Sequence, residues 1–134
     1  MLLIPKNFNW ELEENINLKA DTKPHIFITK TGKFTFNTAF MRDCLKKQPK
    51  GVHLAYAEDN MNKYVSFIFT NDLNAPNVRK LSYIKKIYAN ISAVSFFKKK
   101  DINYKNREAK DRAFVPEKIH DNNLGELWFI TIEK

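Results

Sequence analysis

Three kinds of residue could carry chemistry in this chain of 134 residues: three histidines, one cysteine and 23 lysines and arginines. His25, His53 and His120 have no partner at the i+3 or i+4 spacing of a zinc-binding helix, and Cys44 has no second thiol nearby. The 3 glycines are too few to form a phosphate-binding loop. The sequence therefore predicts no metal, no cofactor and no small-molecule substrate.

Carboxylates give little support for catalysis. The pairs Glu13–Glu14 and Glu58–Asp59 are adjacent, so on a strand they point to opposite faces, whereas two-metal nucleases bring carboxylates together from separate elements. His120 follows a basic segment and is the one histidine that suits a metal-independent ribonuclease. We expect no catalytic residue and keep that ribonuclease as an alternative.

Positive charge is concentrated in the second half of the chain. The formal net charge is +8 and the pI is about 9.5. Residues 79–118 contain twelve basic and four acidic residues, an excess equal to the net charge of the whole chain. Such a field attracts polyanions. A merely solubilising surface would give the same pattern, and an anionic membrane is disfavoured because no amphipathic basic helix is visible.

Lysines and tyrosines on expected strands and hairpin turns form the candidate binding set. Cations there would follow phosphates while rings stack on unpaired bases, at roughly 1–3 kcal/mol per base. Reading a duplex would instead need a helix or ribbon that fits the major groove. The predicted nucleic-acid-binding residues are Lys30, Lys33, Lys63, Tyr64, Lys80, Tyr83, Lys85, Lys86 and Tyr88.

Residues 25–48 have the pattern that would position the first of these side chains. Apolar residues alternate as far as Phe36 and then recur three or four positions apart, which predicts strand, turn, strand and helix. Gly32 suits the tight turn and Asn37 the helix N-cap. Strands at 51–58 and 63–70 follow, joined by a polar loop.

A weaker copy of this order begins about 55 positions later. It has Ser92 at the N-cap position that Asn37 takes in the first copy. The further expected elements are strands at 80–84 and 87–91, a helix with Val94, Phe96 and Phe97 inward, and strands at 107–115 and 126–133 around a polar loop at 116–124.

These patterns predict an α+β fold of antiparallel curved sheets with two short helices, built as internally duplicated ββαββ units. Residues 1–22 are expected to form an N-terminal arm, and residues 23–134 a single nucleic-acid-binding domain with halves 23–70 and 78–134. The arm begins with only four apolar residues, so we expect neither a signal peptide nor a membrane span. One cysteine fits a reducing compartment, and a cytoplasmic location is expected.

The segments Ile28–Ala39 (ITKTGKFTFNTA) and Ile91–Phe97 (ISAVSFF) resemble small phage proteins of the Whirly-type and transcriptional-coactivator-type single-stranded-DNA-binding superfamily. The resemblance covers about residues 24–133. It implies curved antiparallel sheets braced by helices, assembly as dimers or higher oligomers, and nucleic acid lying across the sheets. It also implies a role in phage replication, recombination or transcription in the host cytoplasm, with the lysine and tyrosine set as the site.

We therefore expect a homo-oligomer that binds single-stranded nucleic acid, DNA rather than RNA, with little sequence preference. The acidic arm could compete with this ligand for the cationic surface. Three alternatives stay open. They are a duplex-DNA-binding transcriptional regulator with swapped hairpins, which the Thr31–Gly32 unit also resembles, a phage protein-interaction module, and the small ribonuclease.

Overall fold

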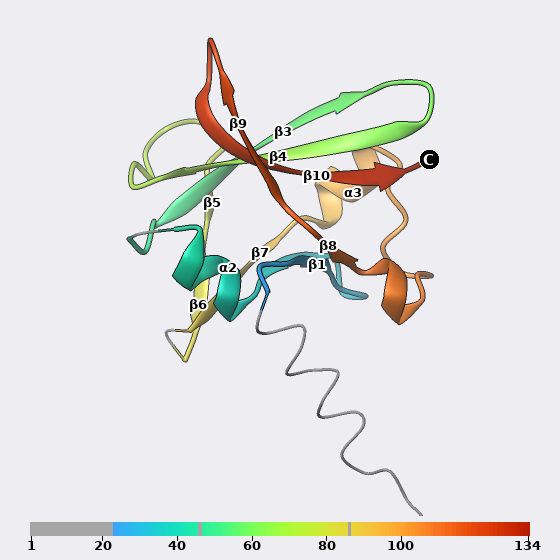
Figure 1. The fold of residues 1–134 in the computed structure, drawn as a ribbon, viewed down its shortest axis with the longest axis horizontal. Coiled ribbons are helices and arrows are strands. Elements are labelled where there is room, and N and C mark those ends of the chain that lie inside the picture. The colour runs from blue at the N-terminus through green and yellow to red at the C-terminus, as the bar shows by residue number, and fades with distance from the viewer. Residues whose placement is uncertain (1–22, 46, 86) are drawn as a thin grey trace, which may run out of the picture.

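The computed structural model describes residues 23–45, 47–85 and 87–134, so the expected arm at 1–22 lies outside the described residues. Within these ranges the chain forms two five-stranded sheets, here called sheet A (order β6-β7-β2-β1-β8) and sheet B (order β5-β3-β4-β10-β9), shown in Figure 1. The strands are β1 (Ile26–Ile28), β2 (Lys33–Phe36), β3 (Gly51–Glu58), β4 (Asn62–Thr70), β5 (Arg79–Lys80), β6 (Ser82–Ile84), β7 (Tyr88–Ser92), β8 (Ala113–Phe114), β9 (Glu117–Asp121) and β10 (Gly125–Glu133).

Two short helices brace the sheets: α2 (Thr38–Asp43) and α3 (Val94–Lys99). A 3₁₀ helix, η2 (Ala109–Asp111), precedes β8. All paired strands are antiparallel, which confirms the predicted α+β class. Neither helix in the described ranges has the length and hydropathy needed to cross a membrane.

Buried aromatic rings join the two sheets. Phe67 of β4 meets Phe34 and Phe36 of β2 edge to face, with ring centroids 5.0 and 5.3 Å apart. Phe40 of α2 lies 5.7 Å from Phe36, and Phe97 of α3 lies 4.8 Å from Phe34. All five rings are fully buried, as the strand alternation and helical spacing predict. The core therefore fills the space between the sheets, with one helix at each end.

The predicted N-cap of the first helix is confirmed. Asn37 is buried, and its Oδ1 accepts from the backbone N–H groups of Phe40 (2.9 Å) and His25 (3.0 Å). The helix ends at Asp43 instead of continuing to residue 48. Ser92 was the wrong N-cap for the second helix, because it is the last residue of β7 and Ala93 takes the cap position without a side-chain bond.

The expected strand at 107–115 is mostly wrong. Only Ala113–Phe114 is strand there, while β9 lies inside the expected loop. The Arg107 side chain donates to the main-chain oxygen of Asp111, and the Arg112 side chain donates to that of Tyr104, so residues 104–112 are held in a loop. β9 is an edge strand with mostly exposed side chains, so it lacks an apolar alternation that could reveal it.

The two halves interleave their strands. β2 pairs with β7 at the centre of sheet A, and β4 pairs with β10 at the centre of sheet B. The first half runs strand, strand, helix, strand, strand, whereas the second half has three strands before its helix, because the expected strand at 80–84 is divided into β5 of sheet B and β6 of sheet A. The second half also adds η2 and has β8 and β9 before β10. The internal duplication therefore stays a prediction.

Candidate nucleic-acid interface

The outer face of sheet A is the candidate interface. Because Ile26, Phe34 and Ile91 point into the core, alternation turns their neighbours outward. The strand register aligns one row across all five strands: Ala113, Phe27, Thr35, Asn90 and Ser82. We call this outer surface the A-face; its members are Phe27, Lys33, Thr35, Ser82, Ile84, Tyr88, Asn90, Ser92 and Ala113. None of these described residues is acidic.

Three lysines of the predicted set belong to the A-face or its turns. Lys33 begins β2 and lies opposite Ser92 in the register. Lys30 is exposed in the β1–β2 turn, and Lys85 is exposed in the β6–β7 turn with φ 53°. Since β2 and β7 are antiparallel, these two turns lie at opposite ends of the sheet. Positively charged side chains therefore lie at both ends of the A-face.

Two rings give the A-face a surface for stacking. Phe27 is half-buried on β1, with its ring centroid 5.9 Å from that of His25. Tyr88, a member of the predicted set, is half-buried at the start of β7. Phe27 is not in the predicted set, which contains only lysines and tyrosines, although alternation puts its ring on the face opposite Ile26 and Ile28.

Sheet B holds three other members of the predicted set. The Lys63 ammonium donates to the main-chain oxygen of Lys100 (2.9 Å) at the end of α3, so its charge is engaged within the molecule. Tyr64 faces the outer side of sheet B, and its hydroxyl donates to Asp59 (2.8 Å). Lys80 is exposed on the edge strand β5.

Tyr83 points inward. Its hydroxyl donates to the main-chain oxygen of Pro49, its ring packs against the core, and burial raises its pKa. Lys86 lies outside the described residues. The predicted set thus does not form a single surface, because strand alternation sends Tyr83 to the opposite face from Tyr88 and the edge position of β5 puts Lys80 in sheet B.

The basic segment between α3 and β8 is partly structural. Arg112 donates from Nη1 to the main-chain oxygen of Tyr104 (2.9 Å) and from Nη2 to that of Lys105 (3.2 Å). Arg107 donates to the main-chain oxygen of Asp111 (3.1 Å), and burial lowers its pKa. Lys105 and Lys110 of this segment are exposed and lie outside the predicted set.

Of the described basic residues that precede His120, Lys118 shares β9 with it, whereas Arg107 and Arg112 bond to Asp111 and Ile28. His120 lies on β9 opposite Glu126, and Figure 1 places the β9–β10 hairpin and η2 at opposite sides of the molecule. Cys44 is half-buried, and burial raises the pKa of its thiol, as does nearby Asp43, so it is a poor nucleophile. No group of three or more His, Cys, Asp or Glu side chains among the described residues is arranged to hold a metal ion.

No protein-family model, curated protein or solved structure matches this chain. A surface with lysines, two rings and no carboxylate can hold a polyanion and stack its bases.

Proposed function

We propose that this protein binds single-stranded nucleic acid across the A-face, DNA in preference to RNA, with little sequence preference. The observation that carries this proposal is a five-stranded surface on which none of the residues that the structure describes is acidic. Lysine side chains at Lys30, Lys33 and Lys85 neutralise phosphates and release counterions. Phe27 and Tyr88 stack on unpaired bases.

The A-face of one subunit offers a single strand only a few contacts. Three neutralised phosphates give a slope of about −2 for log K against log salt on a single strand, and two stacked bases contribute roughly 1–3 kcal/mol each. A second subunit on the same strand would raise the overall affinity without any new kind of contact. This requirement supports the proposal that the protein acts as a homo-oligomer.

A duplex-DNA-binding regulator is the second candidate, and the interleaving of the halves favours it. β2 and β7 form a central antiparallel ribbon, on which Thr35 lies directly opposite Asn90. Asparagine can bond to adenine in a bidentate manner in the major groove, which admits a ribbon of two strands, so this mode requires β2 and β7 to separate from the flanking strands β1 and β6. The same ribbon would then read sequence, and the flanking lysines would hold the backbone.

A competition experiment separates the candidates. The anisotropy of a labelled single-stranded DNA of about one binding site is measured while unlabelled single-stranded DNA, duplex DNA or RNA is added. The proposal predicts that single-stranded DNA competes best. Stronger competition by duplex DNA would support the regulator. Absence of binding to all three at low salt would contradict both and favour a protein-interaction role.

A further inference from the structure

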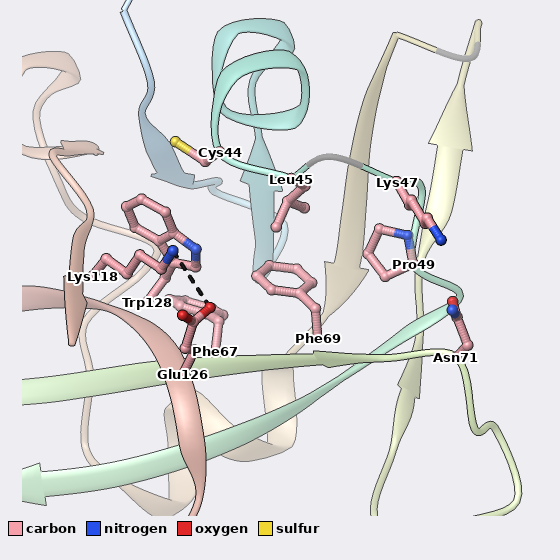
Figure 2. Close-up of a pocket in the computed structure, with 10 residues that line it drawn as sticks. All are labelled: Cys44, Leu45, Lys47, Pro49, Phe67, Phe69, Asn71, Lys118, Glu126 and Trp128. Carbon is pink, nitrogen blue, oxygen red and sulfur yellow. Dashed lines mark ion pairs between the residues drawn. The ribbon is translucent and has the colours of Figure 1, made fainter. Parts of the chain in front are cut away.

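A cleft opens between the end of α2 and sheet B, away from the A-face (Figure 2). Its volume is about 460 Å³, within the range of small-ligand sites. The rings of Phe67, Phe69 and Trp128 line it from the sheet, and Leu45 lies across from Phe69 on the chain that leaves α2. The cleft therefore has an aromatic floor facing an aliphatic wall.

A lysine side chain lies on each side of the aromatic floor of the cleft. Lys118 of β9 lies with Nζ 6.0 Å from the centroid of the Trp128 ring, and Lys47 lies on the opposite side of the cleft in Figure 2. Lys118 also pairs with Glu126, at 3.4 Å between Nζ and Oε2. Both partners of this pair are at least half exposed (50% and 69%), so the pair is weak and Lys118 can turn to another anion.

We propose that this cleft binds one nucleotide, with the base against Trp128 and Phe69 and the phosphate at Lys118 or Lys47. An aliphatic ligand would make no favourable contact with the two ammonium groups, and a simple inorganic anion would make none with the aromatic floor. A planar ring with an attached anion uses both. The Glu126 carboxylate is an acceptor for a base amino group at the same edge.

The inference goes beyond the proposed function, because the cleft and the A-face are separate surfaces. The nucleotide can be a free mononucleotide or one residue of a longer strand, since the chemistry that the cleft recognises is shared. The phosphate is terminal in a free mononucleotide and is joined to a further nucleotide in a strand. Separate titrations with a mononucleotide and a short oligonucleotide therefore distinguish the two ligands.

Intrinsic fluorescence tests the cleft. The chain has 2 tryptophans, so Trp10→Phe leaves Trp128 as the single indole. Adenosine monophosphate and a single-stranded tetranucleotide are titrated separately, with inorganic phosphate, adenosine and octanoate as comparison ligands. We expect saturable quenching by one or both nucleotide ligands, at concentrations about tenfold below those of the comparison ligands. Lys118→Gln should weaken it several-fold, whereas Lys110→Gln on η2, which Figure 1 places on the other side of the molecule from the β9–β10 hairpin, should not.

Cys44 supplies a second readout that does not depend on the indole. It is the only cysteine and lines the cleft, so bound nucleotide should slow its alkylation by a small thiol reagent. Absence of saturable quenching and of protection, or octanoate acting as well as the nucleotides, would overturn the inference. If oligonucleotides still bind in that case and Lys33→Gln weakens them, the A-face proposal stands and only the cleft assignment fails.

Discussion

Arg112 bonds to Ile28, which lies 84 positions earlier in the chain, with 2.9 Å between Nη1 and the main-chain oxygen. The same guanidinium holds the carbonyls of Tyr104 and Lys105. This one side chain therefore fastens the segment after α3 to β1, beside the A-face. The planar guanidinium fork allows three carbonyls to be held at once, which an ammonium group cannot reproduce in the same geometry.

Arg112→Lys should destabilise the protein. Loss of the fork leaves main-chain carbonyls without a donor, so we expect the free energy of unfolding to fall by about 1–3 kcal/mol. Urea denaturation followed by circular dichroism measures this change. The control is Lys110→Gln, at an exposed position of η2, with an expected change within about 0.5 kcal/mol. Equal effects of the two substitutions would show that the Arg112 contacts contribute nothing.

Asn37→Ala should cost more than Ser92→Ala. Asn37 is buried and serves two backbone N–H donors, and its own Nδ2 donates to the main-chain oxygen of Lys23 (2.8 Å). Removing a helix cap typically costs about 0.5–2 kcal/mol, and we expect the upper end because the site is buried. Ser92 caps nothing by its side chain in α3, so its replacement should change thermal unfolding little. A larger loss at Ser92 would refute the assignment of the caps.

Gly32→Asn and Gly125→Asn separate steric from backbone effects. Both glycines have positive φ (85° and 81°), which asparagine tolerates better than most residues. A Cβ at Gly32 would lie 2.4 Å from Cγ2 of Val94, whereas at Gly125 it would meet nothing within 4 Å. We expect Gly32→Asn to lose about 1–3 kcal/mol or more, and Gly125→Asn much less, in urea unfolding. Similar losses would mean that the β1–β2 turn is not packed against α3.

Asp59 should make folding stability depend on acid pH. The Tyr64 hydroxyl and the N–H groups of Asn62 and Met61 donate to its carboxylate and lower its pKa. A carboxyl with a lowered folded pKa contributes stability above its unfolded pKa of about 3.9, and that contribution is lost as the pH falls through the lower folded value. Asp59→Asn should therefore lower the melting temperature more at pH 6 than near pH 3. An equal difference at both pH values would contradict this.

The core was predictable from the sequence because its signal is local. Alternation puts Ile26 with Ile28, and Phe34 with Phe36, on one face of their strands, and all four are fully buried. The edge strand β9 was not predictable, because its partner β10 supplies the pairing while its own side chains are exposed.

The site was only partly predictable. Alternation indicates which side chains point away from the core, but it does not indicate the sheet. Tyr88 and Tyr64 both point away from the core, yet Tyr88 lies on sheet A and Tyr64 on sheet B. The sheet to which a strand belongs is decided by pairing between distant segments, such as β2 with β7, and no local pattern encodes it. The cleft beside Trp128 depends on four separate segments and was missed for the same reason.

The salt dependence of single-strand binding is the most direct test of the A-face. The triple variant Lys30→Gln, Lys33→Gln and Lys85→Gln is compared with Lys80→Gln, Lys99→Gln and Lys110→Gln, which removes the same charge from exposed positions elsewhere. Our account predicts that the first triple makes the slope of log K against log salt shallower by about 2, while the second leaves it nearly unchanged. An unchanged slope in the first triple, or an equal change in both, would contradict binding across the A-face.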